Sequence, residues 1–268
     1  MYNLLSNLLS DKKGGAVFTC FGAAHLCYIL LTALAAAIVI IYAKGKTSDD
    51  KRRITRTLSG IAFGLYMLDF FLMPLAYGEI DIEKLPFHVC TAMCVCCFLC
   101  EHTKLFGKYR VHFALLGFIS NLIYLLYPAG VMWYQVHPLS YRVVQTLIFH
   151  GCMTVYGLLA LVSEGRTFDW KRCYRDLAVL CCMTLWAMLG NAIYNGNSGD
   201  YNHFFNWFFV VRDPFYLIPE SISPYVMPLI NIAAFFAVEM LVYLVCIKVR
   251  KSLPREGGGP HERWKEPA

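Results

Sequence analysis

The sequence predicts an all-α protein: a polytopic membrane helix bundle of seven transmembrane helices, with the N-terminus outside and the C-terminus in the cytoplasm. Hydrophobic residues make up 58% of the chain and charged residues only 16%, a balance too apolar for a soluble domain of this length. The apolar residues gather into seven stretches, and the connecting loops alternate between rich and poor in Lys and Arg. Together these observations predict a bundle whose outer surface contacts lipid.

Each of the seven apolar stretches is predicted to form one helix. They cover residues 17–43, 58–77, 85–100, 111–128, 141–163, 177–194 and 225–247. Most of them approach or exceed the about 20 apolar residues that a helix needs to cross a bilayer. The third stretch is shorter, and a core helix of a soluble protein is the alternative for it. Leaving it out would break the alternation of loop charge, so we count seven spans.

The charge of the loops predicts the orientation. Lys and Arg together number six, one, three, none, four and one in the six successive loops, and six in the tail. An excess of Lys and Arg marks the cytoplasmic side of a membrane. The loops and tail predicted to be cytoplasmic are residues 44–57, 101–110, 164–176 and 248–268. Lys12 and Lys13 oppose this orientation, but the larger basic cluster between the first two spans outweighs them.

The chain is predicted to hold one membrane domain, residues 17–247, between an outer tail of residues 1–16 and a cytoplasmic tail of residues 248–268. The first span is too long for the apolar region of a cleavable signal peptide, and we expect it to be retained. The segment Pro254–Ala268 is polar and rich in Gly and Pro, which predicts disorder. The plasma (cytoplasmic) membrane is the expected location.

The net charge of +6 lies mostly on the predicted inner loops and tail. Anionic lipid headgroups are the ordinary partner of such charge, so membrane lipids are expected as partners and nucleic acid is not. The sequence leaves the oligomeric state open. Gly60 and Gly64 form a GxxxG step in the second span, which permits close helix packing.

Twelve cysteines raise the question of disulfides or metal. Six of them fall inside apolar spans, where cysteine behaves as a small hydrophobic residue. Five more crowd the third span, without the paired CxxC spacing or the local histidines of a structural zinc site. We therefore expect most of them to be packing residues, and we expect neither a metal nor a cofactor.

Polar side chains of six predicted helices share one layer in the outer half of the bundle. These are Asp69, His88, Cys90, Asn121, His150, Asn191 and Asn231. At 1.5 Å of rise per residue they lie roughly 5 to 13 Å below the outer ends of their spans. Ionisable groups inside a membrane are costly and tend to mark function. A structural hydrogen-bond network is the alternative, and it is favoured for each asparagine taken alone.

The segment Leu85–Cys90 (LPFHVC) is the most specific local motif. Pro86 suits the first turn of a helix, because the missing N–H has no intrahelical partner there. Cys90 would then lie near a helix N-terminus, whose dipole and free amides favour a thiolate. A cysteine nucleophile also needs a nearby base. His150 is the candidate, because His88 is two residues from Cys90 and would point elsewhere on a regular helix.

Three features of this sequence resemble the YwaF family of bacterial integral membrane proteins. They are the string LPFHVC, His150 within TLIFHG, and Asn191 before a Gly/Asn/Tyr-rich loop, and the resemblance runs from about residue 60 to 247. That family is similar to the eukaryotic transmembrane-protein-164 acyltransferases, which move acyl chains between phospholipids through a cysteine and a histidine. The resemblance implies these roles for Cys90 and His150. The loop here reads GNSGDYNHFF, a departure that carries no role over to Tyr201 or Asn202.

The preferred function is therefore a lipid acyltransferase that forms a cysteine acyl-thioester in an outward-facing pocket. The side chains expected to bind substrate or to orient the imidazole are Asp69, His88, Asn121, Asn191, Arg212 and Asn231. A transporter for a small solute or cation could use the same polar layer, although Glu239 is the one obvious ionisable group of the inner half. A non-catalytic membrane sensor is the third alternative. The aromatic run of the 195–224 loop suits either a cap over the bundle mouth or an interfacial belt.

Overall fold

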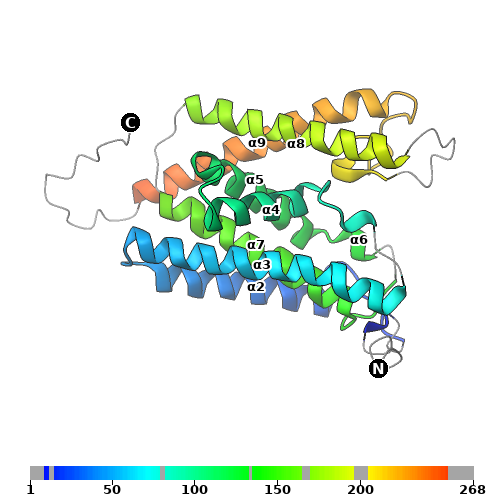
Figure 1. Cartoon of the computed structure of the whole chain (residues 1–268), viewed down its shortest axis with the longest axis horizontal. Helices are drawn as coiled ribbons and strands as arrows, with labels where there is room; N and C mark the ends of the chain where they lie inside the picture. Colours follow the sequence, from blue (N-terminus) through cyan, green and yellow to red (C-terminus); the bar gives the residue numbers. More distant parts are fainter. Residues whose placement is uncertain are drawn as a thin grey trace, which may run out of the picture.

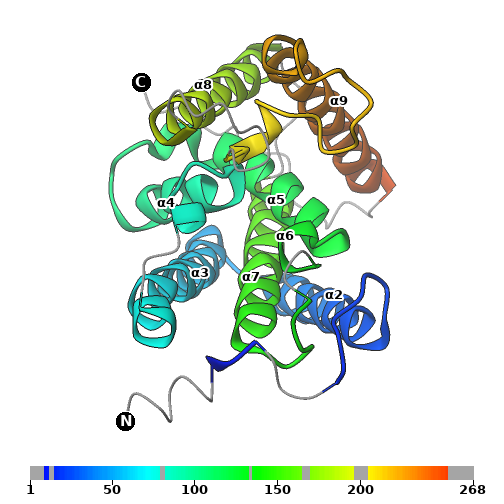
Figure 2. The same ribbon diagram turned by 90° about the vertical axis from the view of Figure 1, so that its right-hand side faces the viewer.

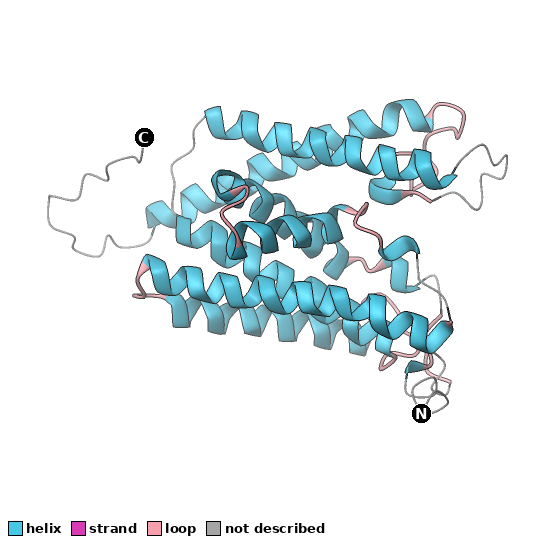
Figure 3. Cartoon of the chain, in the orientation of Figure 1, coloured by secondary structure: helices cyan, strands magenta, loops and turns pink. Residues whose placement is uncertain are grey.

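The computed structural model describes residues 9–11, 15–78, 82–132, 135–164, 170–195 and 205–252, and all regular structure within these ranges is helical (Figure 3). The main helices are α2 (Ala23–Ala43), α3 (Ser48–Tyr77), α4 (Val89–His102), α5 (Arg110–Leu126), α7 (Tyr141–Glu164), α8 (Trp170–Asn195) and α9 (Ser223–Ser252). Shorter helical pieces are η1 (Ile82–Lys84), η2 (Gly107–Tyr109), α6 (Ala129–Met132) and η4 (Trp207–Phe209). The prediction of an all-α fold is confirmed. The segment Pro254–Ala268, which was predicted to be disordered, lies outside the described ranges.

Six helices of the described chain are long and apolar enough to cross a membrane. The six segments are Ala23–Ala43, Ser48–Leu75, Gly107–Met132, Tyr141–Ser163, Arg172–Asn195 and Ser223–Cys246. α4 is apolar but has only 14 residues, about 21 Å at 1.5 Å per residue. Six of the seven predicted spans therefore have a matching helix of membrane-crossing length, and a crossing by α4 remains a prediction, as does the orientation.

The long helices run roughly alongside one another, and the chain passes back and forth between the two ends of the bundle (Figure 1). We call one end the N-terminal end: α2 begins there, and the segments before α4, α7 and α9 lie there. The other is the C-terminal end, where α9 ends and the segments after α2 and α4 lie. α4 runs within the bundle and packs against both α3 and α5.

Figure 2 looks along the bundle and shows α5 in the middle. α5 packs on α7 and α4 and also contacts α8 and α9, which pair with each other. α2 and α3 both pack on α7. Most of α7 is buried, whereas very little of α2 is buried, and leucine and isoleucine side chains such as Leu30, Leu34 and Ile41 lie exposed on its surface. Such a surface is suited to lipid.

α5 and α7 approach closely because Gly157 has no side chain. A Cβ atom placed at Gly157 would lie 2.6 Å from Cβ of Phe118 and 2.9 Å from the carbonyl oxygen of Ala114. Small residues permit such contact between helix backbones in membranes. The close packing of this pair matters for the site, because Asn121 and His150 lie on these two helices.

α3 begins ten residues before the predicted start of its span, at Ser48 instead of residue 58. The hydroxyl of Thr47 caps the helix by accepting a hydrogen bond from the N–H of Asp50 at 3.2 Å. Asp49 and Asp50 lie in the first turn, where a carboxylate interacts favourably with the helix dipole. The helix thus extends beyond its apolar part, which is all that hydrophobicity detects. α8 likewise begins at Trp170 instead of residue 177.

Candidate functional site

His150 and Asn121 form a buried pair between α7 and α5. Nδ1 of His150 lies 2.7 Å from Oδ1 of Asn121, and the residues are 6% and 0% exposed. The amide nitrogen of Asn121 donates to the carbonyl oxygen of Gly117 at 2.7 Å, which identifies the atom facing His150 as the acceptor oxygen. Nδ1 must therefore carry the proton of a neutral imidazole. Nε2 is left as the basic nitrogen.

The imidazole of His150 is also held on its face. The ring of Tyr124 stacks on it with 3.9 Å between centroids and 15° between planes. Tyr124 lies one turn after Asn121 on α5, so a single helix supplies both the hydrogen-bond acceptor and the stacking partner. This arrangement restrains the ring in position and in tautomer, which is what a general base requires.

Cys90 lies in the first turn of α4, at the N-terminal end of the bundle. The thiol interacts with the Ser120 side chain, and Cys90 packs against the cluster that includes Phe149. Ser120 immediately precedes Asn121, and Phe149 immediately precedes His150. Cys90 and His150 therefore contact adjacent residues of α5. Cys90 also keeps some accessible surface, in contrast to the fully buried Cys94 and Cys97 of the same helix.

His88 is the N-cap residue of α4, and its backbone is extended. The helix therefore begins at Val89, later than predicted, and Pro86 precedes it. The carbonyl oxygen of His88 accepts a hydrogen bond from the Thr91 hydroxyl at 3.0 Å. The side chain is half-buried, and its imidazole interacts electrostatically with the ammonium of Lys84 and with the imidazole of His150. His88 thus belongs to the same polar region as His150.

Asp69 of α3 lies beside a lysine that the sequence analysis did not select. Its Oδ2 is 3.1 Å from Nζ of Lys84, and its Oδ1 accepts a hydrogen bond from the Tyr141 hydroxyl at 2.8 Å. The carboxylate is therefore bound at both oxygens, and Asp69 is only 2% exposed. Asp69 connects α3, the segment before α4 and the start of α7. Within the described part of the chain, no hydrogen bond or ion pair joins Asp69 to His150.

Asn191 and Asn231 bind backbone groups of the aromatic segment before α9. The Asn191 side chain donates to the carbonyl oxygen of Trp207 and accepts from its N–H, each at 3.1 Å. The Asn231 side chain donates to the carbonyl oxygens of Phe208 and Phe209 at 2.7 and 3.0 Å. Both asparagines were predicted to bind substrate, and these contacts assign them a structural part in fixing η4.

The aromatic segment itself packs into the bundle. Trp207 and Phe208 are 1% and 2% exposed and join a core cluster with Phe87 and Leu180. It is therefore more deeply buried than an interfacial belt would be. Tyr201 and Asn202 lie outside the described residues.

Arg212 and Asp213 follow this segment. The Asn206 side chain binds the N–H and the carbonyl oxygen of Arg212, and the Arg212 guanidinium lies 6.0 Å from the Tyr216 ring centroid. The carboxylate of Asp213 accepts hydrogen bonds from the N–H groups of Phe215, Leu217 and Ile218. These bonds, that of Phe215 first, lower the pKa of Asp213.

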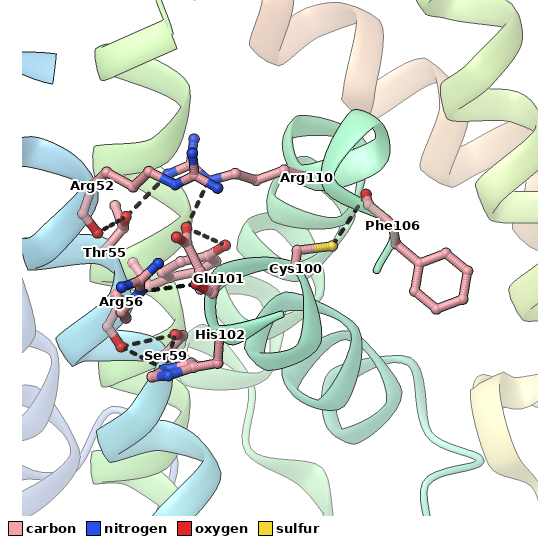
Figure 4. Close-up of polar contacts among 10 residues, drawn as sticks. Arg52, Thr55, Arg56, Ser59, Cys100, Glu101, His102, Phe106 and Arg110 are labelled. Carbon is pink, nitrogen blue, oxygen red and sulfur yellow. Dashed lines mark hydrogen bonds and ion pairs between the residues drawn. The ribbon is translucent and has the colours of Figure 1, made fainter. Parts of the chain in front are cut away.

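A second group of buried polar side chains lies at the C-terminal end, and the sequence analysis missed it. Figure 4 shows Arg110 and Arg56 meeting Glu101 at the end of α4. Nε of Arg110 lies 2.6 Å from Oε1 of Glu101, and Nε of Arg56 donates to the Glu101 carbonyl oxygen at 2.9 Å. Glu101 is fully buried. Glu101 is the first residue of a predicted loop, and charges in loops are expected to be solvated. The sequence therefore did not indicate that Glu101 is buried.

A third buried pair joins α5 to α8. Nδ1 of His112 lies 2.5 Å from Oδ1 of Asp176. Glu239 and Tyr243 of α9 both interact electrostatically with Asp176. The C-terminal half of the bundle therefore holds further ionisable groups besides Glu239, which was the only one identified there from the sequence.

All twelve cysteines lie in the described ranges, and none of them forms a disulfide. The described residues contain no group of three or more His, Cys, Asp or Glu side chains arranged to hold a metal ion.

A bundle of long apolar helices with charged and polar pairs enclosed among them defines a multi-pass helical membrane protein. The model of the TMEM164 family matches residues 20–249, and the chain belongs to this family. No curated protein and no solved structure matches the chain. The family agrees with the predicted resemblance to transmembrane-protein-164 proteins, whereas the assignment to the bacterial YwaF family remains a prediction.

Proposed function

We propose that this protein is a lipid acyltransferase in which Cys90 is the nucleophile and His150 is the general base. Two neighbouring residues of α5 support this proposal, since the Cys90 thiol interacts with the Ser120 side chain and Asn121 binds His150. A cysteine nucleophile requires a base that is oriented by a third group. Asn121 orients His150 through Nδ1, which leaves Nε2 available for the proton of the thiol.

The reaction would proceed in two balanced steps. Nε2 of His150 takes the proton of the Cys90 thiol, and the thiolate attacks the carbonyl carbon of an acyl ester. The C–S bond forms, the ester C–O bond breaks, and the imidazolium gives its proton to the departing alkoxide. In the second step His150 takes a proton from the acceptor hydroxyl, whose oxygen attacks the thioester. The C–S bond breaks, and the sulfur regains a proton from the imidazolium.

Partial exposure supports Cys90 as the reacting cysteine among the five of α4. Cys94, Cys97 and Cys100 are fully buried, whereas Cys90 and Cys96 keep accessible surface. Cys90 is the one of these two that contacts Ser120. Cys96 therefore provides a matched control on the same helix.

The proposal is tested by intact-mass spectrometry of the purified protein after incubation with membrane phospholipids. We expect a fatty-acyl mass increase that hydroxylamine removes, that is absent from Cys90→Ala and that persists in Cys96→Ala. Equal labelling of Cys90→Ala and the wild type would rule out the thioester at Cys90.

Transport of a small solute or cation is the second candidate function. One observation from the structure supports it. His112, Asp176 and Glu239 place buried ionisable groups in the C-terminal half, opposite the layer of Asp69 and His150. Uptake into proteoliposomes that requires Asp176 or Glu239 but not Cys90 would favour transport over acyl transfer.

A further inference from the structure

We propose that Lys84 forms a binding site for a phosphate group at the N-terminal end of the bundle, with Asp69 and Tyr66 holding it in place. Lys84 was counted as a loop charge in the sequence, and no role followed from it. This inference rests on the proposed function only in treating the phosphate as part of the acyl donor. The site itself is argued from the contacts of Lys84.

The position of Lys84 is fixed at two points. Its carbonyl oxygen accepts a hydrogen bond from the Tyr66 hydroxyl at 2.9 Å, and its ammonium lies 3.1 Å from the Asp69 carboxylate. Both Tyr66 and Asp69 belong to α3 and are buried. A lysine that is already ordered loses less side-chain entropy when it binds a ligand.

The two partners of this ion pair differ in their exposure. The Lys84 side chain is 22% exposed, whereas that of Asp69 is 2% exposed. Both Asp69 oxygens already have partners in Lys84 and Tyr141, and a ligand would therefore meet the ammonium and not the carboxylate. An ammonium has three N–H donors, so the pairing with Asp69 leaves donors for an anion.

Lys84 also interacts electrostatically with histidines of the proposed site. Its charge interacts with the imidazoles of both His88 and His150, and Lys84 precedes Cys90 by six positions at the start of α4. In a phospholipid the phosphate lies on the water side of the ester carbonyls. A cation in the segment before α4, with a thiol in the first turn of that helix, matches that order.

Two arginines of this end have partners of their own. Arg142 pairs with Asp11 at 3.3 Å, and the Arg212 guanidinium lies near the Tyr216 ring. Lys binds phosphate as a compact point charge. The geometry thus points to Lys84 as the phosphate-binding cation of this end.

The test compares two lipids with identical acyl chains, dioleoyl phosphatidylglycerol and dioleoylglycerol, bound to the full chain in a neutral detergent. We expect the wild type to prefer the phospholipid, and we expect Lys84→Gln to lose about tenfold or more of that preference, because a charge-assisted hydrogen bond disappears. Lys84→Arg and the distant control Lys108→Gln are expected to keep it. An unchanged preference in Lys84→Gln would overturn the proposal.

Asp69→Asn separates ligand binding from a purely structural ion pair. Removing the carboxylate charge leaves the Lys84 ammonium uncompensated, so phospholipid affinity is expected to rise even as stability falls. If the ion pair had only a structural role, Asp69→Asn and Lys84→Gln would weaken phospholipid binding alike. That result would also overturn the proposal. This variant keeps the test decisive if Lys84→Gln fails to fold.

Two further arms identify the source of the phosphate and separate this inference from the proposed function. If millimolar inorganic phosphate competes with the phospholipid, the site binds free phosphate. If inorganic phosphate does not compete, the site binds the lipid headgroup. Binding does not require chemistry. A Lys84-dependent preference without any acyl adduct on Cys90 would therefore contradict the acyltransferase and leave the phosphate site standing.

Discussion

The side chain of Asn121 accepts a hydrogen bond from Nδ1 of His150 over 2.7 Å. This bond fixes the tautomer of an imidazole that is 6% exposed, and the donation from Asn121 to the Gly117 carbonyl fixes the amide. Sequence reasoning placed Asn121 among the substrate-binding residues. Within the proposed function, this contact with His150 gives Asn121 the part of a positioning residue for the base.

Asn121→Leu is expected to slow acylation of Cys90 by at least about tenfold, because the imidazole then loses its preferred tautomer. Asn121→Asp retains an acceptor for Nδ1–H and should shift the pH dependence of acylation without abolishing it. Pulsed labelling followed by mass spectrometry across a range of pH measures both effects. Equal rates in Asn121→Leu and the wild type would exclude a positioning role.

Replacing Asn191 by alanine should destabilise the protein by about 1–3 kcal/mol, because the buried backbone groups of Trp207 lose their partners. Thermal unfolding in detergent measures the loss, and quenching of Trp207 fluorescence by acrylamide should increase as η4 loosens. Asn195→Ala is the comparison, since Asn195 binds Phe205 and is less buried. Unaltered unfolding of Asn191→Ala would show that the contact does not hold the segment.

Breaking the ion pair between Glu101 and Arg110 should cost about 3–5 kcal/mol when one partner is removed, because the other charge remains buried. Arg110→Met is therefore expected to unfold at a markedly lower temperature. The double variant Glu101→Gln/Arg110→Met should recover part of the loss. A double variant no more stable than Arg110→Met would contradict this account of the pair.

The bonds of Asp213 predict a pH-dependent loop. Since the folded pKa lies below the ordinary value, the carboxylate stabilises the segment above the unfolded pKa of about 3.9. That contribution is lost as the pH falls through the folded pKa. Resistance of the 213–222 segment to an acid-active protease should decline over this range. Asp213→Asn should remove the pH dependence, and an unchanged acid response in that variant would refute the assignment.

The fold was predictable to the extent that apolar stretches define helices. Hydrophobicity located the long helices, but it missed the first ten residues of α3, since their order comes from the Thr47 cap and acidic first turn. The short α4 is recognisable from its apolar composition, whereas its position inside the bundle depends on contacts with α3 and α5.

The candidate site was predictable only in part, because depth along a helix does not determine contact. Asn121 and Asn191 looked alike in the sequence, yet one binds an imidazole and the other binds backbone. Lys84 was overlooked since a single loop cation normally lies in water. A carboxylate predicted to lie inside a span, such as Asp69, was the available signal that a nearby loop should supply a cation.

The central claim is that Cys90 and His150 together transfer an acyl chain. The most direct measurement follows a deuterium-labelled acyl chain from a donor phospholipid to a lysophospholipid in proteoliposomes that contain the purified protein. We predict transfer by the wild type and by Cys96→Ala, and only the protein-free background for Cys90→Ala and His150→Ala. Transfer by Cys90→Ala at the wild-type rate, or no transfer by a folded wild type, would contradict the claim.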